Sequence, residues 1–121
     1  MKRLIWIAGV VLLSACAGEG TTVYNHLGNA VGSVRVDDKN HAMVFNDNGE
    51  TIGIVQGNIV HTQQGRAGQI MESKIYDNKR REVGTMGDGT DCYNASGKRV
   101  GRLSSVIDPE AAGGACLLLL L

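Results

Sequence analysis

The chain has 121 residues, with twelve basic and twelve acidic side chains, so its formal net charge is zero. This balance gives no support for nucleic-acid binding, which needs a basic surface. Seventeen glycines and one proline, beside only one Phe, one Trp and three Tyr, argue against an aromatic-rich stacking surface. They favour a small all-β domain of many short strands joined by tight turns.

Residues 1–15 have the pattern of an export signal: two basic residues, an apolar run over Leu4–Leu13, and small residues before Cys16. The run is too short to be a stable membrane anchor. The segment Leu13-Ser14-Ala15-Cys16 resembles the lipobox of bacterial lipoproteins. The alternative is an ordinary secreted protein in which this Cys has no special role.

The lipobox resemblance implies that Cys16 carries a lipid and becomes the mature N-terminus in the bacterial cell envelope. Ala17 stands where inner-membrane retention would require Asp, so an outer-membrane location is favoured. Residues 16–22 are small and polar and are expected to be a lipidated tether. Removal of the signal leaves ten basic and twelve acidic residues, because Lys2 and Arg3 are lost.

A hairpin pattern recurs five times in residues 23–103. Each copy has an apolar residue, a ring, a small polar residue, a turn that usually contains Gly, and a return of the form apolar, Gly, any, apolar. The outgoing arms with their turns are 23–28, 44–49, 60–65, 75–80 and 92–97, and the returns are 31–34, 52–55, 67–70, 83–86 and 100–103. A fixed period of this kind predicts repeated hairpins.

The turn Asn46-Asp47-Asn48-Gly49 is typical of a three-residue hairpin loop with a bulge, in which Gly takes a positive φ. Such a loop places Asn46 opposite Glu50 and, by extension, Val44 opposite Ile52. The Gly inside each return strand needs its own reason, since Gly weakens a strand. We expect the recurring ring to lie over this bare backbone.

Two copies depart from the pattern. The third has His61 in the ring position and a return that is one residue shorter; His61 is expected to fill an aromatic slot rather than to bind metal. The fourth has Arg80 where the others have Gly. A left-handed conformation costs about 1 kcal/mol in a non-Gly residue, which favours a different loop there.

A polar insertion, Asp37–His41, separates the first two hairpins. Together with Asp47 it could form a cation site of oxygen ligands. The alternative is a solvated connecting loop. The spacing of a calcium-binding EF-hand is missing, so we predict no metal site.

Basic residues concentrate on or beside the turns of the third to fifth copies. We call these six residues the basic rim, and they could meet anionic lipid or an envelope polymer if the hairpins point the same way. The alternative is a solvated surface that keeps the protein soluble. The basic rim consists of Arg66, Lys79, Arg80, Arg81, Lys98 and Arg99.

The pattern ends at Leu103, and residues 104–110 have the composition of a linker. Leu117–Leu121 is too short to cross a membrane, so we expect it to be buried, either as a final strand or as a plug along the axis of the array. Cys92 stands where other copies have Val or Ile and is expected to be a small core residue. A disulfide to Cys116 is the alternative.

The five [VIC]-[YFH]-[NTD]-x-x-G hairpins and the Leu-rich end resemble the five-fold β-flower repeat domain. The likeness covers residues 23–103 well and the tail loosely. It implies five hairpins about a pseudo-five-fold axis, closed by the C-terminal segment, so the repeat domain is expected to span residues 23–121. Other short β-repeats, including MORN arrays, share the general motif.

The β-flower resemblance implies no catalytic residues, and the sequence contains no nucleophile, phosphate-binding or dinucleotide-binding motif. We therefore expect a non-enzymatic envelope lipoprotein without cofactors, held to the membrane by the lipid on Cys16, that acts as a structural or interaction module and contacts another envelope component. The alternative is a ligand- or ion-binding lipoprotein that uses the Asp37–His41 loop. A cell-wall hydrolase ranks third.

Overall fold

The computed structural model describes residues 20–38 and 40–121 of the chain. The predicted signal segment, Cys16 and Lys39 lie outside the described residues. Within them the strands are β1 (Gly20–Asn25), β2 (Ala30–Asp38), β3 (His41–Asn46), β4 (Thr51–Gln56), β5 (Ile59–Thr62), β6 (Gly65–Met71), β7 (Lys74–Asp77), β8 (Glu82–Gly87), β9 (Asp91–Asn94) and β10 (Arg99–Leu103), and the helix is α2 (Pro109–Leu119).

The strands form antiparallel hairpins that close into a barrel. Each strand pairs with its neighbours in the chain, and β1 pairs with β10, so the ten strands of the described residues leave no open edge. Closure removes the unpaired backbone groups that would otherwise invite aggregation. The predicted all-β fold of repeated hairpins is confirmed.

Side chains alternate between the inside and the outside of the barrel. Val23 and Val44 are fully buried, whereas the neighbouring rings of Tyr24 and Phe45 lie on the outer face and are partly exposed. This follows from the two-residue period of a strand. The inward residues of the hairpins are small or branched, which leaves space for a further element at the centre.

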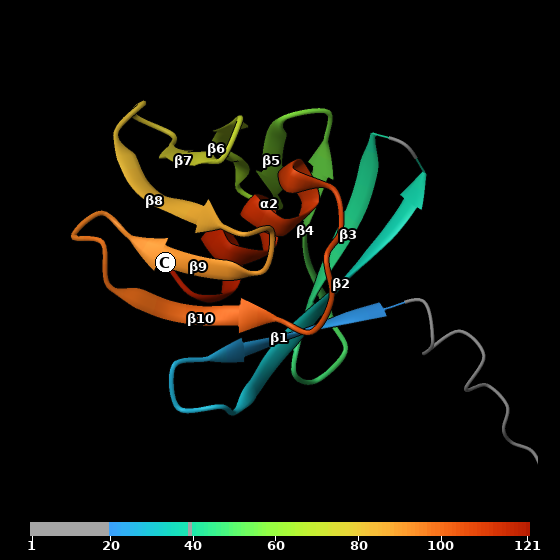
Figure 1. Ribbon diagram of the computed structural model, residues 1–121. Helices are drawn as coiled ribbons and strands as arrows, with labels where there is room; N and C mark the ends of the chain where they lie inside the picture. The colour runs from blue at the N-terminus through green and yellow to red at the C-terminus, as the bar shows by residue number, and fades with distance from the viewer. Residues whose placement is uncertain (1–19, 39) are drawn as a thin grey trace, which may run out of the picture.

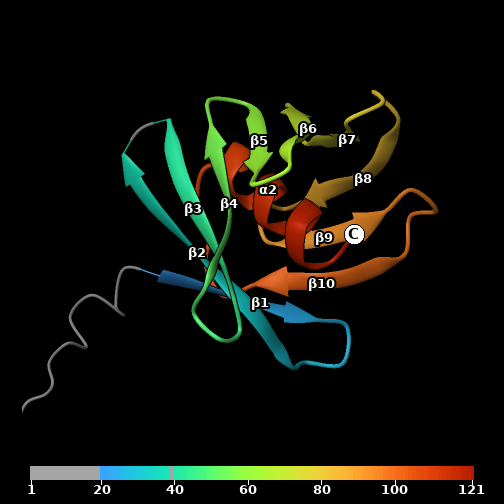
Figure 2. The same cartoon turned by 180° about the vertical axis from the view of Figure 1, so that it is seen from behind.

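Helix α2 fills that space. Figure 1 shows α2 at the centre of the ring of strands, and the reverse view in Figure 2 shows it enclosed in the same way. The helix residues Ala111–Cys116 are buried and are all small, so a helix fits within the narrow barrel. Of the two alternatives for the tail, the plug is correct, but the expected burial is incomplete: Leu117–Leu120 are half-buried and Leu121 is exposed. Pro109 and Glu110, predicted as linker, already belong to the helix.

The tail leucines fit against the glycines of the return strands. A methyl group added at Gly68 would lie 2.7 Å from Leu117 Cδ2, closer than atoms can pack. The same relation joins Gly32 to Leu119, Gly53 to Leu118, Gly84 to Leu121 and Gly101 to Leu120. Glycine is therefore needed because each leucine packs directly on the bare backbone.

The expected ring over the return-strand glycines is wrong. Each of these glycines instead faces the backbone carbonyl of the ring residue in the next hairpin; at Gly32 this is the carbonyl of Phe45. The rings point to the outer face because they are one residue out of phase with the inward apolar residue. A ring does cover a different glycine: Tyr93 Cε2 lies 2.7 Å from the Cβ position of Gly87.

The predicted strand register is correct at the turn and wrong beyond it. The backbone N–H of Asn46 donates to Glu50 O over 2.9 Å, as expected. Val44, however, lies opposite Gly53 rather than Ile52, because a bulge adds one residue to the return strand. The same shift pairs Val23 with Gly32, Ile75 with Gly84 and Cys92 with Gly101.

A disulfide joins Cys92 of β9 to Cys116 of α2, with the two Cα atoms 6.1 Å apart. Both residues are fully buried. Cys92 therefore fills the apolar slot of its hairpin, as predicted, and also fixes the helix to the barrel wall. The disulfide is the alternative that the spacing of the cysteines left open.

The first strand begins earlier than the repeat pattern indicated. Gly20–Thr22, predicted as part of the tether, belongs to β1. Thr21 is buried, and its Oγ1 lies 2.9 Å from Ser105 Oγ, while Ser104 N donates to Thr22 O over 2.8 Å. These bonds connect the start of the barrel to the segment that leads into α2.

Candidate interaction surface at the hairpin tips

The tip loops share one stabilising device. Asn46 begins its loop, and its Oδ1 accepts hydrogen bonds from Asn48 N over 2.9 Å and from Glu50 N over 3.0 Å. Asn25, Asp77 and Asn94 do the same in their own tips. Such side chains replace backbone partners within a turn and so hold the loop without tertiary support.

The tip of β7–β8 has the same loop as the others, so the expectation of a different loop is wrong. Arg80 N donates to Asp77 O over 3.0 Å, as Gly49 N does to Asn46 O. Arg80 accordingly takes a φ of 66°, where Gly49 takes 85°. The hydrogen bonds accepted by Asp77 hold the arginine in this unfavourable conformation.

The carboxylate of Asp77 is stabilised by the loop that it organises. Hydrogen bonds from the backbone N–H groups of Arg81 and Lys79 lower the pKa of Asp77 below its usual value, and the Arg81 side chain adds to this effect. Arg81 Nε lies 2.9 Å from Asp77 Oδ2.

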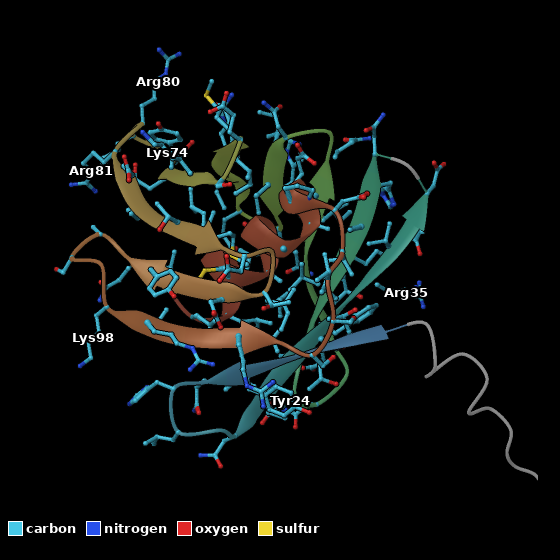
Figure 3. All side chains as sticks on the ribbon, viewed as in Figure 1. Tyr24, Arg35, Lys74, Arg80, Arg81 and Lys98 are labelled. Carbon is cyan, nitrogen blue, oxygen red and sulfur yellow. A yellow bond between two sulfur atoms is a disulfide. The ribbon has the colours of Figure 1, made fainter. Side chains whose placement is uncertain are left out.

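The basic rim is divided between paired and unpaired charges. Arg81 pairs with Asp77, and Arg99 Nε lies 3.3 Å from Asp91 Oδ1. Lys79, Arg80 and Lys98 form no ion pair within the described residues. Figure 3 shows the Arg80, Arg81 and Lys98 side chains pointing outward on one side of the molecule.

The remaining member of the basic rim is Arg66, on the shorter β5–β6 hairpin. Its guanidinium donates to Gln69 Oε1 over 3.1 Å. Thr62 pairs with Gly65 in this hairpin, so only two residues form its loop, in keeping with the irregular third repeat. His61 occupies the ring position on the outer face, opposite Ile54 of the neighbouring strand.

The proposed ligands of the cation site do not come together. Asp37 lies near the end of β2, beside the start of β3, whereas Asp47 follows the end of β3. The two carboxylates therefore lie at opposite ends of β3. The carboxylate of Asp37 is already engaged: Arg35 Nε lies 3.0 Å from its Oδ1 and His41 Nδ1 lies 3.1 Å from its Oδ2. The hydrogen bond from Arg35 lowers the pKa of Asp37, and His41 contributes in the same direction.

A metal-ligating cluster is also missing elsewhere in the described part of the chain, where no three His, Cys, Asp or Glu side chains gather around one point. The interior offers little room. A cavity of about 10 Å³ lies where α2 begins, between Val36, His41, Val55 and Ala111. This volume suits about one water molecule.

Acidic residues collect at the end of the barrel opposite the tips, a feature that the repeat pattern did not indicate. The chain turns there between hairpins and enters α2. We call these six residues the acidic end: Asp37, Asp38, Glu72, Asp88, Asp108 and Glu110. Their positions between successive repeats were visible in the sequence, but only the barrel topology places them together.

No family model matches the chain, and the searches of curated proteins and of solved structures find no significant match either. Among residues 20–38 and 40–121, no helix has both the length and the apolar character needed to span a bilayer. The function must therefore be argued from the residues and the geometry.

Proposed function

We propose that this chain is a non-enzymatic lipoprotein of the bacterial cell envelope, anchored through a lipid on Cys16, whose barrel is a five-fold β-flower domain acting as an interaction module. The observation that carries the proposal is the plugged interior. Helix α2 occupies the centre of the barrel, and its leucines contact the glycine of every hairpin. The domain therefore presents only its outer surface to a partner.

The tip loops support this role because each is held by hydrogen bonds within its own loop. Each is held by its own Asn, Asp or Thr side chain, so its outward residues contribute little to the core. Loops on a rigid scaffold are where proteins usually carry binding function. An ion-binding role is less favoured, since Asp37 is already paired with Arg35 and lies far along the strand from Asp47.

Metabolic labelling with radioactive palmitate tests the anchor. The wild-type protein is expected to incorporate the label and to fractionate with outer membranes, whereas Cys16→Ser abolishes both, because the thiol of Cys16 is the group that carries the lipid. The double variant Cys92→Ala, Cys116→Ala is the control, since it removes the other two cysteines together without leaving a free thiol and should leave labelling per molecule unchanged. Undiminished labelling of Cys16→Ser would end the lipoprotein proposal.

A further inference from the structure

We propose that the tips of β7–β8 and β9–β10 bind an anionic glycan polymer on the side of the protein that faces away from its own membrane. We call Lys79, Arg80, Arg81 and Lys98 the basic sector. The proposal rests on the lipid anchor at Cys16 proposed above, and it adds the direction of the binding surface and the chemistry of its partner.

The course of β1 indicates which end of the barrel faces the membrane. This strand starts at Gly20, beside the turns that join the hairpins, and runs to the first tip at Asn25. In Figure 1 the start of β1 lies on the right, and the tips of β1–β2, β7–β8 and β9–β10 lie on the left. An anchor at Cys16 therefore holds the acidic end nearest the membrane.

The tether is too short to reverse this orientation. Three residues lie between Cys16 and Gly20, which makes four Cα-to-Cα steps, and an extended chain gains at most about 3.5 Å per step, or about 14 Å in all. The six residues of β1 span about 20 Å at 3.3 Å each, before the tip loop is added. An upright barrel thus cannot turn its tips to the bilayer that holds its lipid.

The charges reinforce the same orientation. The acidic end has six carboxylates, against which Arg35 and Lys74 lie in the described chain, so its excess negative charge is repelled by anionic headgroups, whereas the basic sector is carried to the far side. The β3–β4 tip, which carries Asp47 and Glu50, is not adjacent to either basic hairpin in the barrel order. Within the basic sector Arg81 is paired with Asp77, so the unpaired positive charge on this side of the tip surface is that of Lys79, Arg80 and Lys98.

Arg80 provides a second, independent indication. It occupies a position of positive φ that Gly28, Gly49 and Gly97 take at the corresponding tips, and its side chain points into solvent. Glycine at this site would relieve the backbone strain. A strained arginine without an ion pair among the described residues indicates a role for its charge beyond stability.

The composition of the basic sector favours a polyanionic glycan over a folded protein. The large exposed apolar residues of the described chain are Leu27, Ile54, Met71, Val106 and Leu121. None belongs to the tip loops of β7–β8 and β9–β10, although Leu121 packs on Gly84 of β8. Protein interfaces are usually centred on buried apolar or aromatic anchors. Long cationic side chains without such an anchor suit a flexible polymer with repeated carboxylate or phosphate groups.

Binding of the purified protein in nonionic detergent to immobilised polygalacturonate tests the proposal whether or not Cys16 is acylated, with neutral dextran as the blank. Arg80→Gly and Lys98→Gln should each weaken binding about threefold or more, and binding should fall as the salt concentration rises from about 50 mM to about 200 mM. Arg35→Gln removes the same charge on the other side of the molecule and should leave binding unchanged. Arg80→Gly should also raise Tm, because glycine adopts this positive φ without strain. If Arg80 served only to stabilise the loop, Tm would fall instead.

The same protein is then inserted into vesicles of phosphatidylcholine with phosphatidylglycerol. Retained polygalacturonate binding supports an outward-facing basic sector, whereas loss of binding in these vesicles would mean that the sector meets its own membrane. Equal weakening by Arg35→Gln would reduce the effect to net charge and overturn the proposal, as would absence of binding by the wild type. Failure of acylation prevents insertion but leaves the detergent measurement intact, so the two proposals fail separately.

Discussion

At the scale of single residues, the tips depend on one side chain that begins each loop and on one residue of positive φ. Asn25, Asn46 and Asn94 provide neutral amide oxygens, whereas Asp77 provides a carboxylate for the same two hydrogen bonds. The neutral and the charged versions give the same loop. They differ in how the loop responds to pH.

Asp77→Asn is expected to remove a pH-dependent part of the stability while preserving the loop. The pKa of Asp77 is lowered in the folded protein, mainly by the N–H of Arg81, so its stabilisation is present above the unfolded pKa. It is lost as the pH falls below about 4 and through the lower folded pKa. The stability of the wild type relative to Asp77→Asn should therefore decrease in acid, as measured by urea unfolding from pH 7 to pH 2.

Parallel pH curves for the two proteins would contradict this assignment. Asn94→Asp is the reciprocal variant, because it introduces a carboxylate at the equivalent place in another tip, where the backbone N–H of Lys98 donates to it. It should acquire the acid sensitivity that Asp77→Asn loses.

At the scale of elements, the hairpins could be predicted and their exact pairing could not. The turn residues and the apolar flanks are local signals, and they located all the hairpins in the described chain. The bulge at Ile52 depends on what lies inside the barrel, because it turns Gly53 toward Leu118. A one-residue shift of this kind leaves the local pattern unchanged.

The disulfide between β9 and α2 is expected to contribute about 2–4 kcal/mol to stability. The variant with both Cys92→Ala and Cys116→Ala should unfold at a correspondingly lower urea concentration. The wild type with its disulfide reduced provides the comparison, since it keeps the side-chain volume of both residues. Equal urea midpoints for the oxidised wild type and the double variant would show that the bond does not hold the helix in place.

At the scale of the whole molecule, helix α2 and the leucines that follow it complete the core. They fill the space that the hairpins enclose, so the barrel depends on a segment that is far in sequence from most of the strands it contacts. Contacts between residues far apart in the chain slow folding, because the intervening chain must be ordered before they form.

Deletion of Leu117–Leu121 should lower both Tm and solubility sharply. Leu117–Leu120 are only partly buried, so each contributes about 1 kcal/mol, and their joint loss of several kcal/mol is comparable with the whole stability of a small domain. Val106→Ser is the control, because this exposed residue precedes the helix and should leave Tm nearly unchanged. A truncated protein that melts at the wild-type temperature would exclude a core role for the leucines.

The repeated hairpins, their tip loops and the unusual glycine in each return strand could be derived from the amino-acid sequence, because turns and strand alternation depend on near neighbours. The packing role of that glycine, the conformation of the tail and the division of charges between the two ends of the barrel could not be derived in this way. These depend on closure: when β1 meets β10, residues distant in the chain line the same interior, and a helix of small residues fits where a strand would not. Burial in a shared core is a property of the closed barrel rather than of any single hairpin.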